Sequence, residues 1–189
     1  MIKAVLLSIL GGAVCGGAVT KRDSMRRDIP RWAVLSQQDG MYDICGENVR
    51  VSLCDGVLEM SSDTGAYTSD EEWFVADCII ADIDHDGADN VLLHVWKKGS
   101  YGPFQPFWEE DDKDEFSEHL FIYQWDKERA SRLRPIWMSS RMPVTGKRVE
   151  ADDRGVISVT STDNTVSHWY WGTWGLVRLE ESSTYSQTV

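Results

Sequence analysis

Short apolar or alternating runs, separated by turn residues, make up most of the chain from Trp32 onward. The runs are rich in Val, Ile, Tyr, Trp and Phe, which strands favour, and no long segment keeps apolar residues at helical spacing. We therefore expect an all-β fold, with short antiparallel strands in a propeller-like or sandwich arrangement. The predicted strands span residues 32–35, 49–53, 57–60, 73–81, 91–96, 119–125, 132–138, 156–160, 166–171 and 176–179.

Asp/Gly turns recur along this pattern. Asp55-Gly56 predicts the tight turn of a hairpin, and comparable turns follow at Asp86-Gly87 and, in degenerate form, at residues 153–155. This weak recurrence indicates either a decayed internal repeat or only the Asp/Gly turns that are common between β-strands. Between the strands we expect a polar loop at residues 61–70 and a short helix near residues 113–118.

The first 18 residues have the pattern of an export signal, in which Lys3 precedes an apolar run at residues 4–14 and small residues follow. The run is shorter than the ~20 residues that a membrane-spanning helix needs. Basic residues after the run disfavour simple export, which leaves an intracellular protein as an alternative. We expect a signal peptide or membrane anchor (1–18), a linker (19–31), a β-rich domain (32–180) and a flexible tail (181–189). The expected location is secreted or cell-surface, with membrane contact only through an uncleaved N-terminal segment.

Composition and charge narrow the function classes. The formal net charge of −12 excludes a nucleic-acid-binding role, because a phosphate backbone requires a basic face. An acidic protein of this kind binds cations or stays soluble outside a cell. Of the cysteines after the N-terminal segment, Cys45 and Cys54 could form a disulfide, but we favour free thiols for both and for Cys78.

Segment 82–90 combines aspartates at alternate positions with a glycine. Asp82, Asp84 and Asp86 can converge on one point if the chain curls, and Gly87 permits the sharp turn. Calcium takes about 6–8 oxygen ligands, whereas magnesium prefers a tighter shell that is rich in water. We therefore predict a Ca²⁺ site, because three alternating aspartates exceed what a polar turn requires. The expected ligands are the side chains of Asp82, Asp84, Asp86 and Asn90 and the carbonyl of Ala88.

This motif is only half of an EF-hand, since Leu93 stands at the twelfth position and a strand pattern follows. Residues 73–96, and more loosely the strand at 119–125, resemble the integrin-like FG-GAP/VCBS repeat family. In that family an apolar strand, Asp-x-Asp-x-Asp-Gly and another apolar strand follow one another. The resemblance implies a β-propeller unit of an extracellular or surface protein, with the same five calcium ligands. Asn90 stands where the family usually has an acid, which should weaken binding, and only one clear repeat is present.

Two aromatic segments are candidates for ligand binding. Tyr101, Phe104 and Trp108 lie in a long connection, where they could stack on sugar rings or dock a partner, although covering one end of the core is the favoured interpretation. Trp169 and Trp171 share one face of a predicted strand. That face would be a carbohydrate platform if exposed, and we expect it to be core.

The sequence contains no nucleophile elbow, phosphate loop or paired histidines of a metal enzyme, so we assign no catalytic residues. We predict a non-catalytic calcium-binding β module for recognition or structure, with a glycan or a surface protein as its partner. The alternative is a secreted glycan-processing hydrolase whose carboxylate pair is hidden among the acidic residues.

Overall fold

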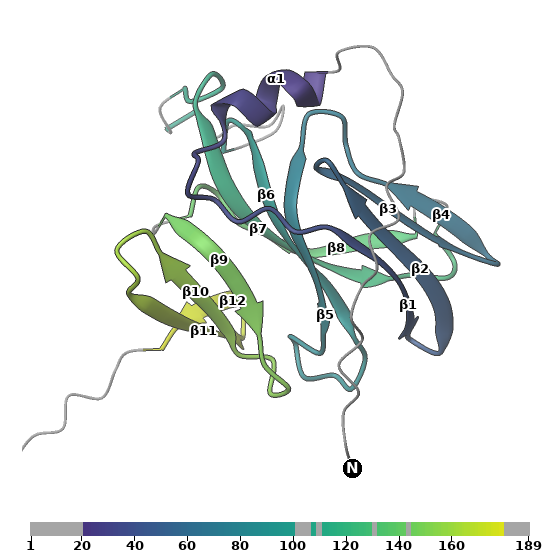
Figure 1. Ribbon diagram of the computed structural model, residues 1–189. Coiled ribbons are helices and arrows are strands. Elements are labelled where there is room, and N and C mark those ends of the chain that lie inside the picture. Colours follow the sequence, from purple (N-terminus) through teal and green to yellow (C-terminus); the bar gives the residue numbers. More distant parts are fainter. Residues whose placement is uncertain (1–20, 101–106, 109–110, 130–131, 143–144, 180–189) are drawn as a thin grey trace, which may run out of the picture.

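The computed structural model describes residues 21–100, 107–108, 111–129, 132–142 and 145–179. These ranges contain one helix and twelve strands, arranged in three four-stranded antiparallel sheets, so the predicted all-β class is confirmed (Figure 1). The elements are α1 (Lys21–Asp28), β1 (Gln38–Ile44), β2 (Glu47–Cys54), β3 (Val57–Ser62), β4 (Gly65–Thr68), β5 (Phe74–Ala81), β6 (Asn90–Lys98), β7 (Phe116–Trp125), β8 (Leu133–Met138), β9 (Gly146–Ala151), β10 (Ile157–Ser161), β11 (Val166–Gly172) and β12 (Gly175–Arg178).

Each sheet is built from four strands that follow one another along the chain. The first sheet has the order β1-β2-β3-β4, the second β5-β6-β7-β8 and the third β12-β11-β10-β9. Neighbouring strands pair antiparallel throughout. Every sheet is therefore an up-and-down meander, and among the described strands no sheet closes into a barrel.

The second sheet is the centre of the molecule, with one neighbouring sheet packed on each face (Figure 1). Val91 and Leu93 point into the core shared with the first sheet, whereas Leu92 points into the core shared with the third. Because successive strand residues face opposite sides, both faces of β6 must be apolar, and its first seven residues are all buried. This double burial explains the continuous apolar run in the sequence.

The segment predicted as a linker contains α1, which packs on the ends of strands in the first two sheets (Figure 1). Met25 and Ile29 are buried. The Arg22 guanidinium donates hydrogen bonds to the carbonyl oxygens of Ser69, Asp70 and Trp73, at 2.7, 2.7 and 3.1 Å. A polar helix of eight residues is too short to be stable alone, so tertiary contacts hold it.

Other local predictions also differ from the structure. Residues 32–35 form no strand; Val34 instead donates its amide hydrogen to Lys147 of β9 at 3.1 Å, and Ser36 donates to Ala76 of β5 at 2.8 Å. This crossing segment therefore joins the second and third sheets. The expected loop at 61–70 contains β4, and the expected helix at 113–118 is absent because β7 begins at Phe116.

Among the described residues, no helix is both long and apolar enough to cross a membrane. The predicted signal segment (1–18) and tail (181–189) lie outside the described residues.

Candidate metal centre

The loop between β5 and β6 carries the aspartate motif, and two side chains fix it to the fold. Ile83 is fully buried in the core between the second and third sheets. Asn90, also fully buried, accepts hydrogen bonds at its Oδ1 from the amides of Ile83 at 2.7 Å and Asp84 at 3.1 Å. An apolar anchor and a buried amide therefore impose the curl that alternating aspartates require to converge.

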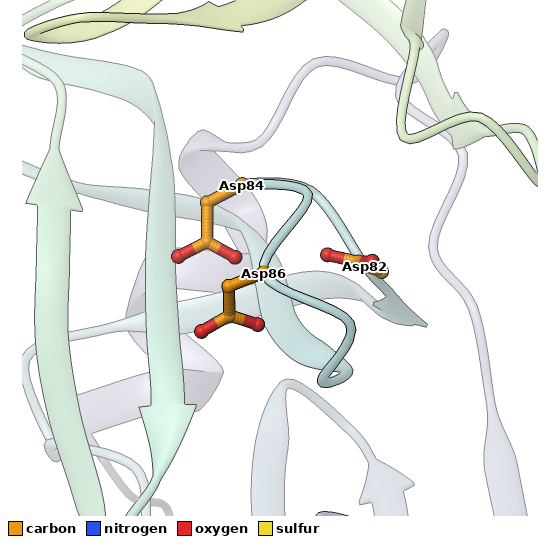
Figure 2. A group of neighbouring side chains, drawn as sticks. All are labelled: Asp82, Asp84 and Asp86. Carbon is orange, nitrogen blue, oxygen red and sulfur yellow. The ribbon is translucent and has the colours of Figure 1, made fainter.

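The three aspartates do converge. One carboxylate oxygen from each of Asp82, Asp84 and Asp86 lies within 4.8 Å of the others. Two oxygens bound to one calcium ion are at most about 5 Å apart, since each metal–oxygen distance is about 2.5 Å. Figure 2 shows Asp84 and Asp86 pointing to the same side of the loop, with Asp82 approaching from the other limb. The triad could hold a metal ion.

Hydrogen bonds inside the loop leave specific oxygens without a partner. The Gly87 amide donates to Asp82 Oδ2 at 3.1 Å, and the Ala88 amide donates to Asp86 Oδ1 at 2.8 Å. Asp82 Oδ1 and Asp84 Oδ1 are buried atoms with no hydrogen-bond partner. Buried polar atoms are nearly always paired in folded proteins, and one cation would satisfy the unpartnered oxygens of both Asp82 and Asp84.

Two further residues were predicted as ligands, Ala88 and Asn90. The structure gives the Asn90 side-chain oxygen two backbone donors in the loop, which occupy both of its lone pairs. Asn90 therefore supports the backbone of the aspartate loop, and its role as a cation ligand stays a prediction. Ala88 is half-buried and lies two residues after Asp86, and its carbonyl stays a predicted ligand.

The loop is also the place where all three sheets meet. On one side, the Cys45 thiol of the β1–β2 turn lies 3.9 Å from the Asp89 carbonyl oxygen. On the other side, Gly155 of the β9–β10 turn packs so closely that a Cβ at this position would lie 2.3 Å from the Asp82 carbonyl oxygen. Burial raises the pKa of the Cys45 thiol, and the negative charge of Asp86 adds to this shift. A cation in the loop would therefore lie where the three sheets contact one another.

We expect the substitution Gly155→Ala to destabilise the protein by about 2 kcal/mol, because it combines a left-handed backbone with a clash against the loop. Gly155 has φ 68° and contacts the Asp82 carbonyl. The matched control is Gly46→Ala, since Gly46 has φ 69° but nothing within 4 Å of the added Cβ; there we expect a loss of about 1 kcal/mol from the backbone alone. Urea unfolding measures both, and equal losses would contradict the close approach.

Among the described residues, Cys45, Cys54 and Cys78 form no disulfide bond, as favoured from the sequence. Burial raises the pKa of the Cys78 thiol, with Asp77 adding to the shift. This thiol lies in the core between the first two sheets, where it is an apolar packing group.

Buried histidines take structural positions in the second sheet. His94 Nε2 lies 3.3 Å from Glu118 Oε2, and Glu118 also accepts the Gly146 amide. His119 Nε2 lies 3.0 Å from the Ser117 hydroxyl, and its Nδ1 lies 3.3 Å from the Ser139 carbonyl oxygen. Burial lowers the pKa of His119 to about 4, so this side chain is neutral near neutral pH.

The aromatic candidates fall into two groups. Tyr101 and Phe104 lie outside the described residues, whereas Trp108 is 70% exposed and meets Phe107 edge-on, with ring centroids 4.8 Å apart. Trp169 and Trp171 are half-buried against the core between the second and third sheets. That face of β11 therefore packs in part against the core and is in part accessible.

The fold and this site define an all-β protein of three stacked meanders, with a three-aspartate loop that could hold a metal ion. No protein-family model, curated protein or solved structure matches the chain. The similarity of the loop to FG-GAP/VCBS repeats therefore stays a prediction.

Proposed function

We propose that this chain is a calcium-binding β module for recognition or structure, and that it is not an enzyme. The observation that carries the proposal is the pair of buried, unpartnered oxygens, Asp82 Oδ1 and Asp84 Oδ1, within a triad completed by Asp86. Deprotonated carboxylates at this spacing repel one another, and a divalent cation turns that repulsion into attraction. Metal binding and stability are then coupled.

Calcium suits this loop better than other common divalent ions. The three side chains of the triad offer hard carboxylate oxygens, which calcium and magnesium accept and which zinc and copper sites use less. Calcium tolerates an irregular shell of protein oxygens and water, whereas magnesium requires a near-ideal octahedron. Three aspartates from one short loop supply the irregular kind of shell.

The position of the loop supports a structural role for the ion. The loop touches the β1–β2 turn through Cys45 and the β9–β10 turn through Gly155. An ion that stiffens this loop fixes the contact surface of both outer sheets. Consecutive four-stranded meanders packed face to face are also the construction of propeller blades, so we propose an open, propeller-like arc in which the loop is the single calcium unit.

A secreted or cell-surface location belongs to the same proposal. Extracellular calcium modules bind with a Kd of about 10⁻⁴–10⁻³ M. A site with three carboxylates, and with a neutral Asn90 in place of a fourth, fits that weak range.

The test is calcium titration of the full chain by calorimetry, with thermal melting alongside. We expect saturable binding, and at saturation a stability gain of about 2.7 kcal/mol when calcium is 100-fold above its Kd. For a protein of this size that gain corresponds to a Tm rise of about 5–10 °C. Asp84→Asn keeps the shape of the side chain but removes its charge, and we expect it to abolish both effects.

The matched control is Asp63→Asn, which makes the same charge change at an exposed residue outside the loop. We expect this control to bind calcium as the unaltered chain does. Absence of binding at millimolar calcium would reduce residues 82–90 to a polar turn. An equal loss in both variants would mean that the effect comes from net charge and not from the triad.

A further inference from the structure

A cleft of about 390 Å³ opens between the second and third sheets. Trp137 of β8 forms one wall, and Trp169 of β11 with Leu176 of β12 forms the other. Residues 139–142, which follow β8, complete the lining. The volume falls within the range of about 300–1,000 Å³ that is typical of small-molecule sites.

The two indole walls are held in place before any ligand arrives. Trp169 Nε1 donates a hydrogen bond to the Ser167 hydroxyl at 2.9 Å, which orients its ring. The Trp137 ring lies against Gly175, where an added Cβ would be 2.3 Å from Nε1. Gly175 has φ 137°, so both its backbone and its lack of a side chain serve this contact. Rigid aromatic walls lower the entropy lost on binding.

The strip along residues 139–142 is fixed by backbone hydrogen bonds. Ser139 donates its amide hydrogen to the Leu120 carbonyl at 2.9 Å, and its hydroxyl accepts the Leu120 amide at 2.9 Å. The Met142 amide donates to the Glu118 carbonyl at 3.1 Å. These bonds tie the strip to β7, so the cleft is preformed.

Polar groups stand at the open side of the cleft. Ser140 and Arg141 are exposed, and the Arg141 guanidinium forms an ion pair with Glu115 at 2.6 Å. Among the described residues, no Asp or Glu lines the cleft. An ion pair at the rim supplies hydrogen-bond donors and acceptors without a net local charge.

These features select the charge and shape of a ligand. The formal net charge of −12 repels anions, and none of the described lining residues is an acid that would attract a cation. Indole faces favour a flat, apolar surface, whereas serine and the ion-paired arginine favour hydroxyl groups. A neutral pyranose satisfies all of these conditions, because its ring has apolar C–H faces and a rim of hydroxyls.

We propose that this cleft is a binding subsite for a neutral sugar ring, stacked on Trp137 and Trp169 and hydrogen-bonded by Ser140 and Arg141. The inference rests on the recognition role proposed above and names its ligand class. Glycoside hydrolysis in this cleft would require two carboxyl groups that flank the sugar, and the described lining offers neither.

The test titrates four neutral trisaccharides, cellotriose, maltotriose, chitotriose and mannotriose, into the full chain with and without calcium. Calorimetry and tryptophan fluorescence follow binding. We expect at least one trisaccharide to bind at millimolar concentration or below, with a change in indole emission. Trp137→Ala should weaken that binding at least about tenfold. The control is Trp174→Ala, because Trp174 is 92% exposed and does not line the cleft, and there we expect unchanged affinity.

Arg141→Ala keeps the test decisive if Trp137→Ala fails to fold, because the arginine is exposed and its loss leaves the core intact. We expect it to weaken sugar binding without a change in Tm. Absence of binding for all four sugars, or equal losses in Trp137→Ala and Trp174→Ala, would overturn the inference. Calcium binding measured on the same samples separates the two proposals: calcium without sugar overturns only the cleft, and sugar without calcium overturns only the metal loop.

Discussion

Phe121→Ala is expected to lower the free energy of unfolding by about 3–5 kcal/mol, the cost of removing a large aromatic ring from a packed core. Phe121 is 2% exposed at the centre of the core between the first two sheets. Its ring packs against Trp73 with a centroid distance of 4.9 Å. Truncation removes this contact and leaves a cavity that the surrounding strands cannot fill without moving.

Urea unfolding followed by tryptophan fluorescence measures this effect. The matched control is Met41→Ala in β1, because Met41 is 63% exposed and should cost within about 0.5 kcal/mol. A loss below about 1 kcal/mol in Phe121→Ala would mean that the first and second sheets do not share a packed core.

Asn90→Ala is the second substitution with a large expected effect. Asn90 Oδ1 accepts the amides of Ile83 and Asp84, and each donor left unpaired in a buried site costs about 1–3 kcal/mol. We expect a total loss of about 2–6 kcal/mol on that basis. The loss should be as large without calcium as with it, because Asn90 supports the loop whether or not an ion is bound.

A second substitution at this position separates support from ligation. Asn90→Asp keeps an oxygen that can accept both amides but adds a buried charge beside the aspartate triad. Without calcium, we expect Asn90→Asp to be less stable than the unaltered chain. When calcium is added, its Tm should rise by more than that of the unaltered chain, because the cation offsets the extra charge. Thermal melting with chelator and with calcium measures the difference. The prediction is contradicted if Asn90→Ala is as stable as the unaltered chain without calcium and its Tm does not rise when calcium is added. Asn90 would then bind the ion and would not support the loop.

Much of the strand pattern was predictable, because successive side chains of a strand point to opposite faces of the sheet. Buried and less buried residues therefore alternate along the sequence. The β2 and β3 hairpin follows from Asp55-Gly56 and the alternating runs around it. Three strands, β1, β4 and β9, were missed for a physical reason. β1 has a single buried residue, Ile44, β4 has none, and β9 has only Gly146 and Val149. Such strands are held by pairing with a neighbour, which leaves little hydrophobic signal in the sequence.

The candidate site was predictable in its chemistry but not in its surroundings. The alternation of Asp82, Asp84 and Asp86 was sufficient to predict their convergence, which the structure places within 4.8 Å. Residue spacing does not say where a side chain points, so the two backbone amides that donate to Asn90 Oδ1 could not be predicted. The approach of Gly155, far along the chain, depends on how the third sheet packs, and local sequence carries no trace of it.

The chain order of the three meanders determines the order in which the protein is completed during synthesis. Each sheet pairs strands that are consecutive in the chain, and contacts between residues near in sequence form fast. N-terminal units generally fold first on the ribosome. The second sheet is therefore finished while β9–β12 are still being made, and until they dock its apolar face, including Leu92 and Leu120, is open to water. Chains that stop after Met138 will present that face permanently and will aggregate.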